Sequence, residues 1–255
     1  MQFELTKEYL EILLHAIERS DEHALLELVN ELHPADIAEI MDELEPDEAL
    51  VLYIVLVGHR AADVLMHLED DSRIEFLAQL TPKEIAEQFI DNLDSDDAAD
   101  MISMLPEGQK EEVLSLIDDR QQARDIVELL HYEEGTAGAL MAKELIRVNV
   151  NWTVSTAVKE MRKQAEQMDH IYTVYVVDDN DVLIGRLQVK KLLLTTVRSK
   201  IADIYDSTIK SVNVDEDQEE IASMMEKYDL VALPVVDEIG RLLGRITIDD
   251  VVDVI

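Results

Sequence analysis

The stretch Val176-Val177-Asp178 … Gly185 returns about 59 residues later as Val235-Val236-Asp237 … Gly244. In both copies an apolar run ends in Val-Val-Asp, a turn follows, and a glycine stands seven residues after the aspartate. These runs predict β-hairpins, because β-branched residues favour strands while Asp, Asn and Gly favour the turn between them. We interpret a tandem repeat of strands and helices as a small-ligand sensor rather than a catalyst.

The same order of elements surrounds each hairpin. In the first copy we expect a strand at 145–150, a helix at 153–168, strands at 173–177 and 182–187, and a closing helix at 189–197. The second copy repeats this order at 211–214, 218–228, 230–236 and 241–246, with a helix from 248 onward. The sequence therefore predicts two β-α-β-β-α units, over residues 142–199 and 200–255.

The first half has a shorter repeat of leucines, spaced 12 or 13 residues apart: Leu32, Leu44, Leu56, Leu68, Leu80, Leu93 and Leu105. Most of its units open with a helix-start signal, as in His33-Pro34, Glu45-Pro46, Thr81-Pro82 and Asp94-Ser95. Helices this short are not stable alone in water, so they must stack. We predict an all-α superhelix of short helices over residues 1–130 and a linker at 131–141. The expected fold class is α plus α/β.

Charge is concentrated in the helical half. The 255 residues carry a net charge of −35, and residues 1–135 hold 8 Lys and Arg against 36 Asp and Glu, a net charge of −28. This argues against nucleic acid as a partner, because binding it requires cations that neutralise phosphates. Divalent cations or a basic protein surface are the natural partners. The alternative is that the acidic surface serves solubility alone.

The sequence offers no motif for catalysis, export or membrane insertion. Cysteine is absent, which excludes disulfides and thiolate metal sites, and no nucleophile motif or Gly-rich phosphate loop is present. The uncharged run from Ala49 to Gly58 is far shorter than the roughly 20 residues of a membrane-spanning helix. We therefore expect a non-enzymatic chain that is soluble on its own.

The doubled β-α-β-β-α order resembles a pair of CBS domains, modules that commonly bind adenine nucleotides. The segment 132–141, Tyr-Glu-Glu-Gly-Thr-Ala-Gly-Ala-Leu-Met, lies between an acidic helical region and this pair and resembles the MgtE family of magnesium transporters. The stretches 215–220, 228–237 and 247–254 resemble the same family. The resemblance spans nearly the whole chain. It implies the cytosolic part of a transporter, on the cytoplasmic face of the membrane, followed in the family by a linking helix and a pore domain.

The resemblance also implies a set of Mg²⁺ ligands, which bridge the helical domain and the CBS pair in that family. The helical ligands would be Asp63, Asp96 and Asp100, facing Asp250 and Asp253, with a further site of Asp217, Glu219 and Asp229. The family position of Asp63 is usually Glu, whose side chain reaches further. The alternative for every pair is a solvated helix rim, since exposed carboxylates usually bind nothing.

Simple electrostatics would make such an interface a switch. Two carboxylates about 6 Å apart repel by roughly 3 kcal/mol at an effective dielectric constant of about 20. Two or three such pairs match the ~5.5 kcal/mol that moves a two-state population from 1:99 to 99:1. Mg²⁺ needs only one or two carboxylates per ion and keeps several waters, so shared coordination would reverse the repulsion.

Nucleotide binding is the second chemistry implied by the CBS resemblance. CBS sites often carry Gly-x-x-Thr-x-x-Asp, which the second copy supplies as Gly244, Thr247 and Asp250. The first copy has Gly185, but Gln188 and Lys191 replace the Thr and the Asp. ATP is thus an alternative ligand, although Asp250 is also a predicted Mg²⁺ ligand. Thr247 would otherwise be an ordinary helix N-cap.

These arguments predict a magnesium-sensing, gate-controlling region of a magnesium transporter or channel, in which Mg²⁺ favours the closed state. CBS pairs generally associate side by side, so we expect a homodimer through the CBS domains. One alternative is a free-standing adenine-nucleotide sensor. Another is a helical scaffold for a basic protein.

Overall fold

The computed structural model describes residues 3–56, 58–168 and 170–254, and the chain divides into two compact units. The first unit comprises residues up to Leu93 together with Asp97–Arg124. The second comprises Asp94–Asp96 and the chain from Asp125 onward.

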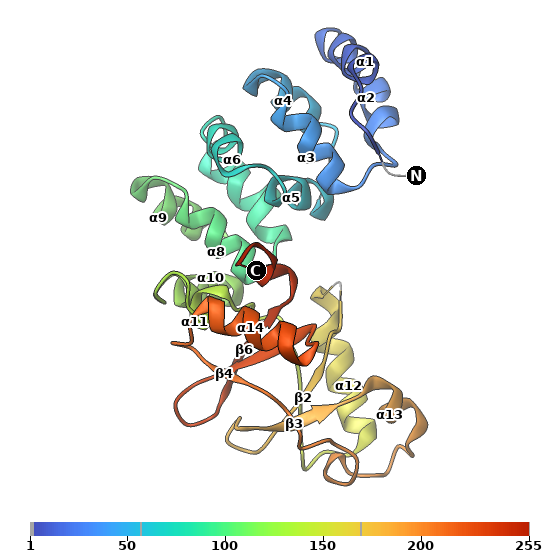
Figure 1. The fold of residues 1–255 in the computed structure, drawn as a ribbon, viewed down its shortest axis with the longest axis vertical. Helices are drawn as coiled ribbons and strands as arrows, with labels where there is room; N and C mark the ends of the chain where they lie inside the picture. Colours follow the sequence, from blue (N-terminus) through green and yellow to red (C-terminus); the bar gives the residue numbers. More distant parts are fainter. Residues whose placement is uncertain (1–2, 57, 169, 255) are drawn as a thin grey trace. The chain divides into compact units, whose positions relative to one another are not determined.

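The first unit is a stack of short helices, coloured blue to green in Figure 1. Its elements are α1 (Lys7–Glu18), α2 (Glu22–Val29), α3 (Pro34–Asp42), α4 (Pro46–Tyr53), α5 (His59–Met66), α6 (Asp70–Leu77), α7 (Pro82–Glu84), the π-helical η1 (Ile85–Phe89), the 3-10 segment η2 (Ile90–Asn92), α8 (Ser95–Ser103) from Asp97 onward, α9 (Glu107–Leu116) and α10 (Arg120–Leu129) as far as Arg124. Helix α3 packs against α5 and α4 against α6, so each helix pair lies on the next. This confirms the expected stacking of short helices.

Capping and a spaced core explain why these short helices form. The helix starts at Pro34, Pro46, Pro82 and Ser95 fall where the sequence predicts them. Five of the seven repeating leucines are buried: Leu56, Leu68, Leu80, Leu93 and Leu105. Tyr53 stacks on Phe89 with ring centroids 5.2 Å apart and meets Phe76 edge-on at 5.1 Å, which joins three helices of the stack. Packing therefore supplies the stability that helices of this length lack in isolation.

The second unit contains two small sheets with the same topology. The first copy is β1 (Ile146–Asn149), α12 (Val154–Gln164), η3 (Ala165–Gln167), β2 (Val174–Val177), β3 (Leu183–Leu187) and α13 (Val189–Leu194). The second copy is β4 (Val212–Asn213), α14 (Gln218–Tyr228), β5 (Ala232–Val236), β6 (Leu242–Thr247) and η5 (Asp249–Val254). The remaining elements are α11 (Ala137–Leu140) before the first copy and η4 (Ile201–Asp203) between the copies. In each sheet the first strand runs parallel to the second, which pairs antiparallel with the third.

The repeated signature has a structural cause in both copies. Val176 pairs with Gly185 and Val235 with Gly244, and each hairpin has a register shift directly after that valine. The carboxylate of Asp178 accepts hydrogen bonds from the amides of Asn180 and Val182, at 2.8 and 3.0 Å. Asp237 accepts from the amides of Ile239 and Arg241 in the same way, at 3.1 and 2.8 Å. The two aspartates therefore fix the turns.

The segment expected to be a linker is folded along the second copy. The amides of Ala137 and Gly138 donate to the carbonyls of Glu216 and Val214, both at 2.8 Å. Further along, Ala142 and Arg245 exchange two backbone hydrogen bonds, of 2.8 and 2.9 Å. Residues 137–142 thus lie along the second copy, where Ala142 pairs with Arg245 of β6. Among the described residues, no helix is long and apolar enough to cross a bilayer.

Candidate functional site

Three carboxylates in the second unit come close enough to share a cation. One oxygen each of Asp94, Asp96 and Glu144 lies within 4.8 Å of the others, and all three side chains are half-buried. Asp94 and Asp96 stand on either side of Ser95, the first residue of α8. Glu144 is two residues after Ala142, which pairs with β6. Burial raises the pKa of Glu144, and the charge of Asp94 raises it further, while hydrogen bonds from Ser95 oppose both effects. Of these three residues the sequence pointed to Asp96 alone.

The other helical acids are placed on the surface of the first unit. Asp63 is exposed on α5, and Asp100 is exposed on α8, one turn after Asp96. Spacing of four residues on one helix lets Asp96 and Asp100 face the same side, as predicted.

The structure separates the residues expected to form one site on the CBS pair. Asp217 caps the start of α14, where its carboxylate accepts from the amide of Glu219 at 2.8 Å. Asp229 follows the other end of the same helix in the left-handed conformation, with φ of 55°. At 1.5 Å per residue, the two aspartates are about 18 Å apart along the helix axis. Asp217 and Glu219 are neighbours, but Asp229 does not join them within one chain.

Asp217 instead borders an acidic groove. The groove has a volume of about 610 Å³ and is lined by Asn213, Asp215, Glu216, Asp217, Glu220 and Glu238. A hydrogen bond between the side chains of Glu216 and Glu220 raises the pKa of Glu216, with burial as the second cause. Carboxylates at this density favour either a shared proton or a cation.

Asp250 and Thr247 bond to each other at the end of β6. The Asp250 carboxylate accepts hydrogen bonds from the amide and the hydroxyl of Thr247, at 2.6 and 2.9 Å. Thr247 is buried, and burial raises the pKa of Asp250 to about 6 against those hydrogen bonds. The side chain of Asp253, the predicted neighbouring ligand, lies outside the described part of the structure.

Gly244 has a packing role that its place in a nucleotide motif did not suggest. A Cβ atom at this position would lie 2.7 Å from the carbonyl oxygen of Ala142 and 2.7 Å from the sulfur of Met141. The absence of a side chain is therefore what lets residues 141–142 run beside β6. Gly185 has the equivalent role in the first copy, because a Cβ atom there would lie even closer to the carbonyl oxygen of Asp206.

Two buried polar residues of this region escaped the sequence reasoning. Tyr175, on β2, is fully buried, and its hydroxyl has no hydrogen-bond partner among the described residues. Burial raises its pKa, and the nearby charge of Arg245 lowers it. Arg245 is itself buried in β6. The available signal was a charged residue standing between Gly244 and Ile246 in an apolar strand.

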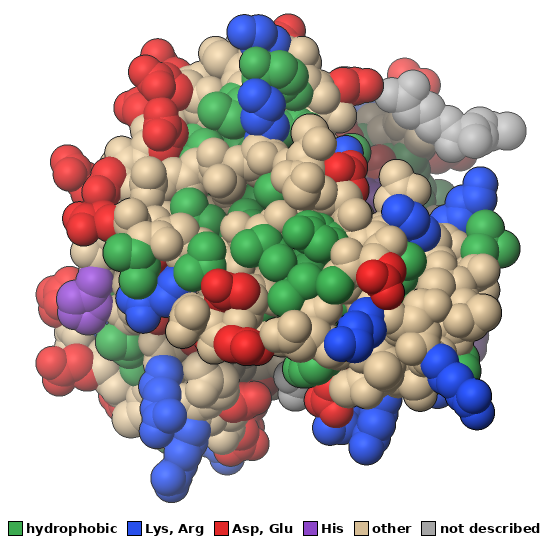
Figure 2. Space-filling view, turned by 90° about the horizontal axis from the view of Figure 1, so that it is seen from below, with side chains coloured by type: hydrophobic (Ala, Val, Ile, Leu, Met, Phe, Trp, Pro, Cys, Tyr) green, Lys and Arg blue, Asp and Glu red, His purple; other side chains and the backbone are tan. Residues whose placement is uncertain are grey.

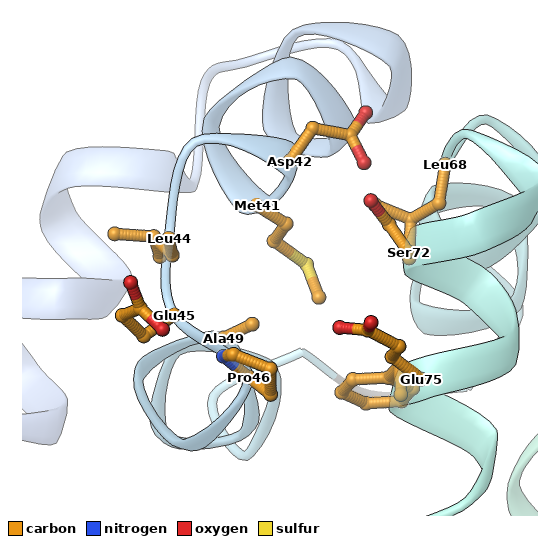
Figure 3. Close-up of a pocket in the computed structure, with 10 residues that line it drawn as sticks. Met41, Asp42, Leu44, Glu45, Pro46, Ala49, Leu68, Ser72 and Glu75 are labelled. Carbon is orange, nitrogen blue, oxygen red and sulfur yellow. The ribbon is translucent and has the colours of Figure 1, made fainter.

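A separate cavity lies in the first unit, among α3, α4 and α6 (Figure 3). It has a volume of about 210 Å³ and is lined by Met41, Asp42, Leu44, Glu45, Pro46, Ala49, Leu68, Ser72, Glu75 and Phe76. In Figure 3 the side chains of Asp42, Ser72 and Glu75 border the same open space. One carboxylate oxygen of Asp42 is buried without a hydrogen-bond partner among the described residues.

Comparison with known families finds matches in both halves of the chain. Residues 32–135 match the MgtE intracellular N domain, and residues 137–194 and 201–255 each match the CBS domain. The sequence and the fold thus define a class of protein in which an acidic helical N domain is joined to a CBS pair. The chain belongs to the MgtE family of magnesium transporters, as the similarities to individual proteins show.

The curated relatives include the magnesium transporter MgtE of Thermus thermophilus, 36% identical over 246 residues, which cover 95% of this chain and 54% of the relative. The MgtE of Bacillus subtilis is 29% identical over 229 residues, covering 89% of this chain and 50% of the relative. The chain therefore spans about half the length of these relatives.

Two solved structures are similar over nearly the whole chain. One is the crystal structure of the soluble part of a magnesium transporter, with a TM-score of 0.82, 34% identity and 97% of each chain covered. The other is the cytosolic domain of the Mg²⁺ channel MgtE in complex with ATP, with a TM-score of 0.87 and 34% identity, covering 96% of this chain and 100% of that one.

Proposed function

We propose that this chain is the magnesium-sensing and gating region of a magnesium transporter or channel. Mg²⁺ would bind the predicted ligands of the helical domain and the CBS pair, and would favour the closed state of a pore domain that lies elsewhere in the full protein. The region would act at the cytoplasmic face of the membrane, without catalysis. The family membership and the charge of −28 over residues 1–135 are the observations that carry the proposal.

The donor chemistry of the described residues fits Mg²⁺. Carboxylate oxygens are the ligands this ion prefers, and at about 2.1 Å from the metal two of them lie up to about 4.2 Å apart. The oxygens of Asp94, Asp96 and Glu144, within 4.8 Å of each other, allow one or two direct bonds with water completing the octahedron. Asp100, Asp63, Asp250, Asp253, Asp217, Glu219 and Asp229 remain the proposed ligands elsewhere.

A titration of this chain with Mg²⁺ tests the proposal. Small-angle scattering and limited proteolysis would follow the radius of gyration and the digestion pattern from chelator to tens of millimolar Mg²⁺. Mutual neutralisation of the acids should make the chain more compact and more resistant. The double variant Asp96→Asn with Asp100→Asn should shift the midpoint to higher Mg²⁺.

Two controls separate binding from charge screening. Glu111→Gln with Glu112→Gln removes the same charge from exposed positions of α9 and should leave the midpoint in place. Sodium chloride at equal ionic strength should produce only a small change. A radius and digestion pattern that stay constant throughout the Mg²⁺ titration would refute magnesium sensing.

Adenine-nucleotide binding is the second candidate function, favoured by the similarity to a cytosolic domain solved with ATP. Gly244, Thr247 and Asp250 remain the residues that we propose for it, and we add the Tyr175 hydroxyl, which is buried without a hydrogen-bond partner among the described residues. Calorimetry with ATP should give heat that falls when Thr247→Val or Tyr175→Phe is introduced. Heat with ATP and none with Mg²⁺ would favour a nucleotide sensor over the magnesium sensor.

A further inference from the structure

Arg245 is a buried cation that binds three different groups. Its Nη2 donates to the Asp94 carboxylate at 2.9 Å, and its Nε donates to the carbonyl oxygen of Glu144 at 2.6 Å. The guanidinium also lies over the ring of Tyr172, 5.0 Å from its centroid. Only 6% of Arg245 is exposed, so an unpaired guanidinium here would be strongly unfavourable. The residue therefore depends on Asp94, and Asp94 is held in place by it.

A second set of hydrogen bonds, made by Ser95, holds the same segment. The amide and hydroxyl of Ser95 donate to one oxygen of the Glu144 carboxylate, at 3.1 and 2.8 Å. The Ser95 hydroxyl oxygen accepts from the amide of Lys143 at 2.8 Å. Ser95 is completely buried. Residues 94–96 are thus attached to the segment beside β6 by an ion pair and by a serine–carboxylate contact.

The carboxylate cluster at this place needs positive charge. Asp94, Asp96 and Glu144 have oxygens within 4.8 Å of one another, a separation at which ionised carboxylates repel each other. A divalent ion is one source of positive charge, and its occupancy depends on its concentration. Arg245 is another source, and because it is part of the chain it is present at every ion concentration.

We propose that Arg245 is a built-in cation of the Asp94–Asp96–Glu144 cluster, which holds residues 94–96 beside β6 without metal and weakens divalent-ion binding there. The positioning part rests on contacts within the second unit alone. The weakening of ion binding rests on the proposed function and deepens it. It names Arg245 as a residue that lowers the affinity of the predicted ligand Asp96 for Mg²⁺. Neutralising Arg245 should make attachment of this segment dependent on the ion.

Hydrogen exchange followed by mass spectrometry can test this on the intact chain. In chelator, the amides of residues 93–97 should be protected in the native sequence, and Arg245→Gln should speed their exchange about 10- to 100-fold, as loss of a charged hydrogen bond predicts. Added Mg²⁺ should restore protection in Arg245→Gln. Arg245→Lys, which keeps the charge, should be intermediate without metal.

The matched control is Arg241→Gln, in the same hairpin. Arg241 is half-exposed and pairs with Asp237 at 2.7 Å rather than with a carboxylate of the cluster, so its loss should leave residues 93–97 protected. If Arg245→Gln fails to fold, Asp94→Asn removes the same ion pair from a side chain that is 42% exposed, and should raise exchange similarly in chelator.

The outcomes separate this inference from the proposed function. The positioning role of Arg245 would be overturned if, in chelator, residues 93–97 were as protected in Arg245→Gln and Asp94→Asn as in the native sequence. It would also be overturned if the native sequence needed Mg²⁺ for this protection. Faster exchange in both variants supports the positioning role even if the native chain shows no Mg²⁺-dependent compaction. Failure of Mg²⁺ to restore protection in Arg245→Gln would overturn the weakening of ion binding.

Discussion

At the scale of single residues, Gly244 shows how a missing side chain positions a whole segment. Its Cα faces the backbone of Ala142, and the two hydrogen bonds between Ala142 and Arg245 form directly beside it. The contacts of Arg245 with Glu144 follow from this register, because Glu144 is two residues after Ala142. One glycine therefore supports both the edge of the second sheet and the carboxylate cluster.

Gly244→Ala should destabilise the second unit by about 1–3 kcal/mol, because its methyl group would meet the backbone of Ala142 at 2.7 Å. Denaturant unfolding followed by circular dichroism would measure this. The control is Gly108→Ala on α9, where an added Cβ would have no neighbour within 4 Å. That variant should be neutral or stabilising by up to ~1 kcal/mol through helix propensity. Equal effects of the two substitutions would contradict the packing role of Gly244.

Residue-level prediction from the sequence succeeded where a residue type has one dominant use. Asp178 and Asp237 were expected in turns, and each accepts two amide hydrogen bonds there. Arg245 and Glu144 could not be paired in advance, because they are 101 positions apart and meet only through strand register. The predicted ligand set remains a prediction, apart from the separation of Asp229 from Asp217 and Glu219.

At the scale of elements, capping decides where the short helices begin, and α7 gives the clearest case. The Thr81 hydroxyl oxygen accepts from the amide of Glu84 at 3.2 Å. The Glu84 carboxylate accepts in return from the amide and hydroxyl of Thr81, at 2.8 and 2.7 Å. The hydrogen bond from the Thr81 amide lowers the pKa of Glu84 most, and the bond from the Thr81 hydroxyl lowers it further. The ionised carboxylate is thus the form that stabilises this helix start.

Thr81→Ala should lower the free energy of unfolding by about 1 kcal/mol at neutral pH. A lowered pKa in the folded state means that the stabilisation by Glu84 is present above its ordinary pKa of 4.5 and is lost as the pH falls through the folded value. Glu84→Gln should therefore be destabilising at pH 7 and nearly neutral at about pH 3. Glu87→Gln, on the same helical run, removes an exposed charge 3.5 Å from Lys83 and should change stability little at either pH.

Element boundaries were predicted well where local signals control them. Helix α14 runs over 218–228 as expected, whereas α13 ends at Leu194 rather than at residue 197, and the last helix is 3-10. The early end of α13 has a tertiary cause. The carbonyls of Val197 and Ser199 accept hydrogen bonds from the amides of Ser155 and Val154, at 3.0 and 2.9 Å, and so cap α12. The pattern of apolar residues in 189–197 cannot predict that these carbonyls are needed as acceptors for the first amides of α12.

At the scale of the whole molecule, exposed apolar side chains on the CBS pair support the proposed homodimer. Leu193 and Leu194 are 79% and 78% exposed, and Val197 is 63% exposed. Figure 2 shows a hydrophobic patch bordered by charged side chains. Exposed apolar side chains often mark an interface.

We expect the native chain to sediment as a dimer, and Leu193→Ser with Leu194→Ser to shift it toward monomer by at least tenfold in dissociation constant, measured by analytical ultracentrifugation. Ile54→Ser, at a residue 60% exposed in the first unit, is the matched control and should leave association unchanged. A native chain that stays monomeric at high micromolar concentration would contradict dimerisation through the CBS pair.

The two hairpins share one frame, with the same aspartate, the same glycine and the same register shift, yet the residues directly after them differ. Gln188 and Lys191 follow the first hairpin, where Thr247 and Asp250 follow the second. The turn aspartate, the glycine and the register shift all lie before these positions, so the two hairpins keep the same backbone pairing with different polar groups after it. A duplicated scaffold of this kind can present different polar groups at two equivalent places, so the two copies need not bind the same ligand.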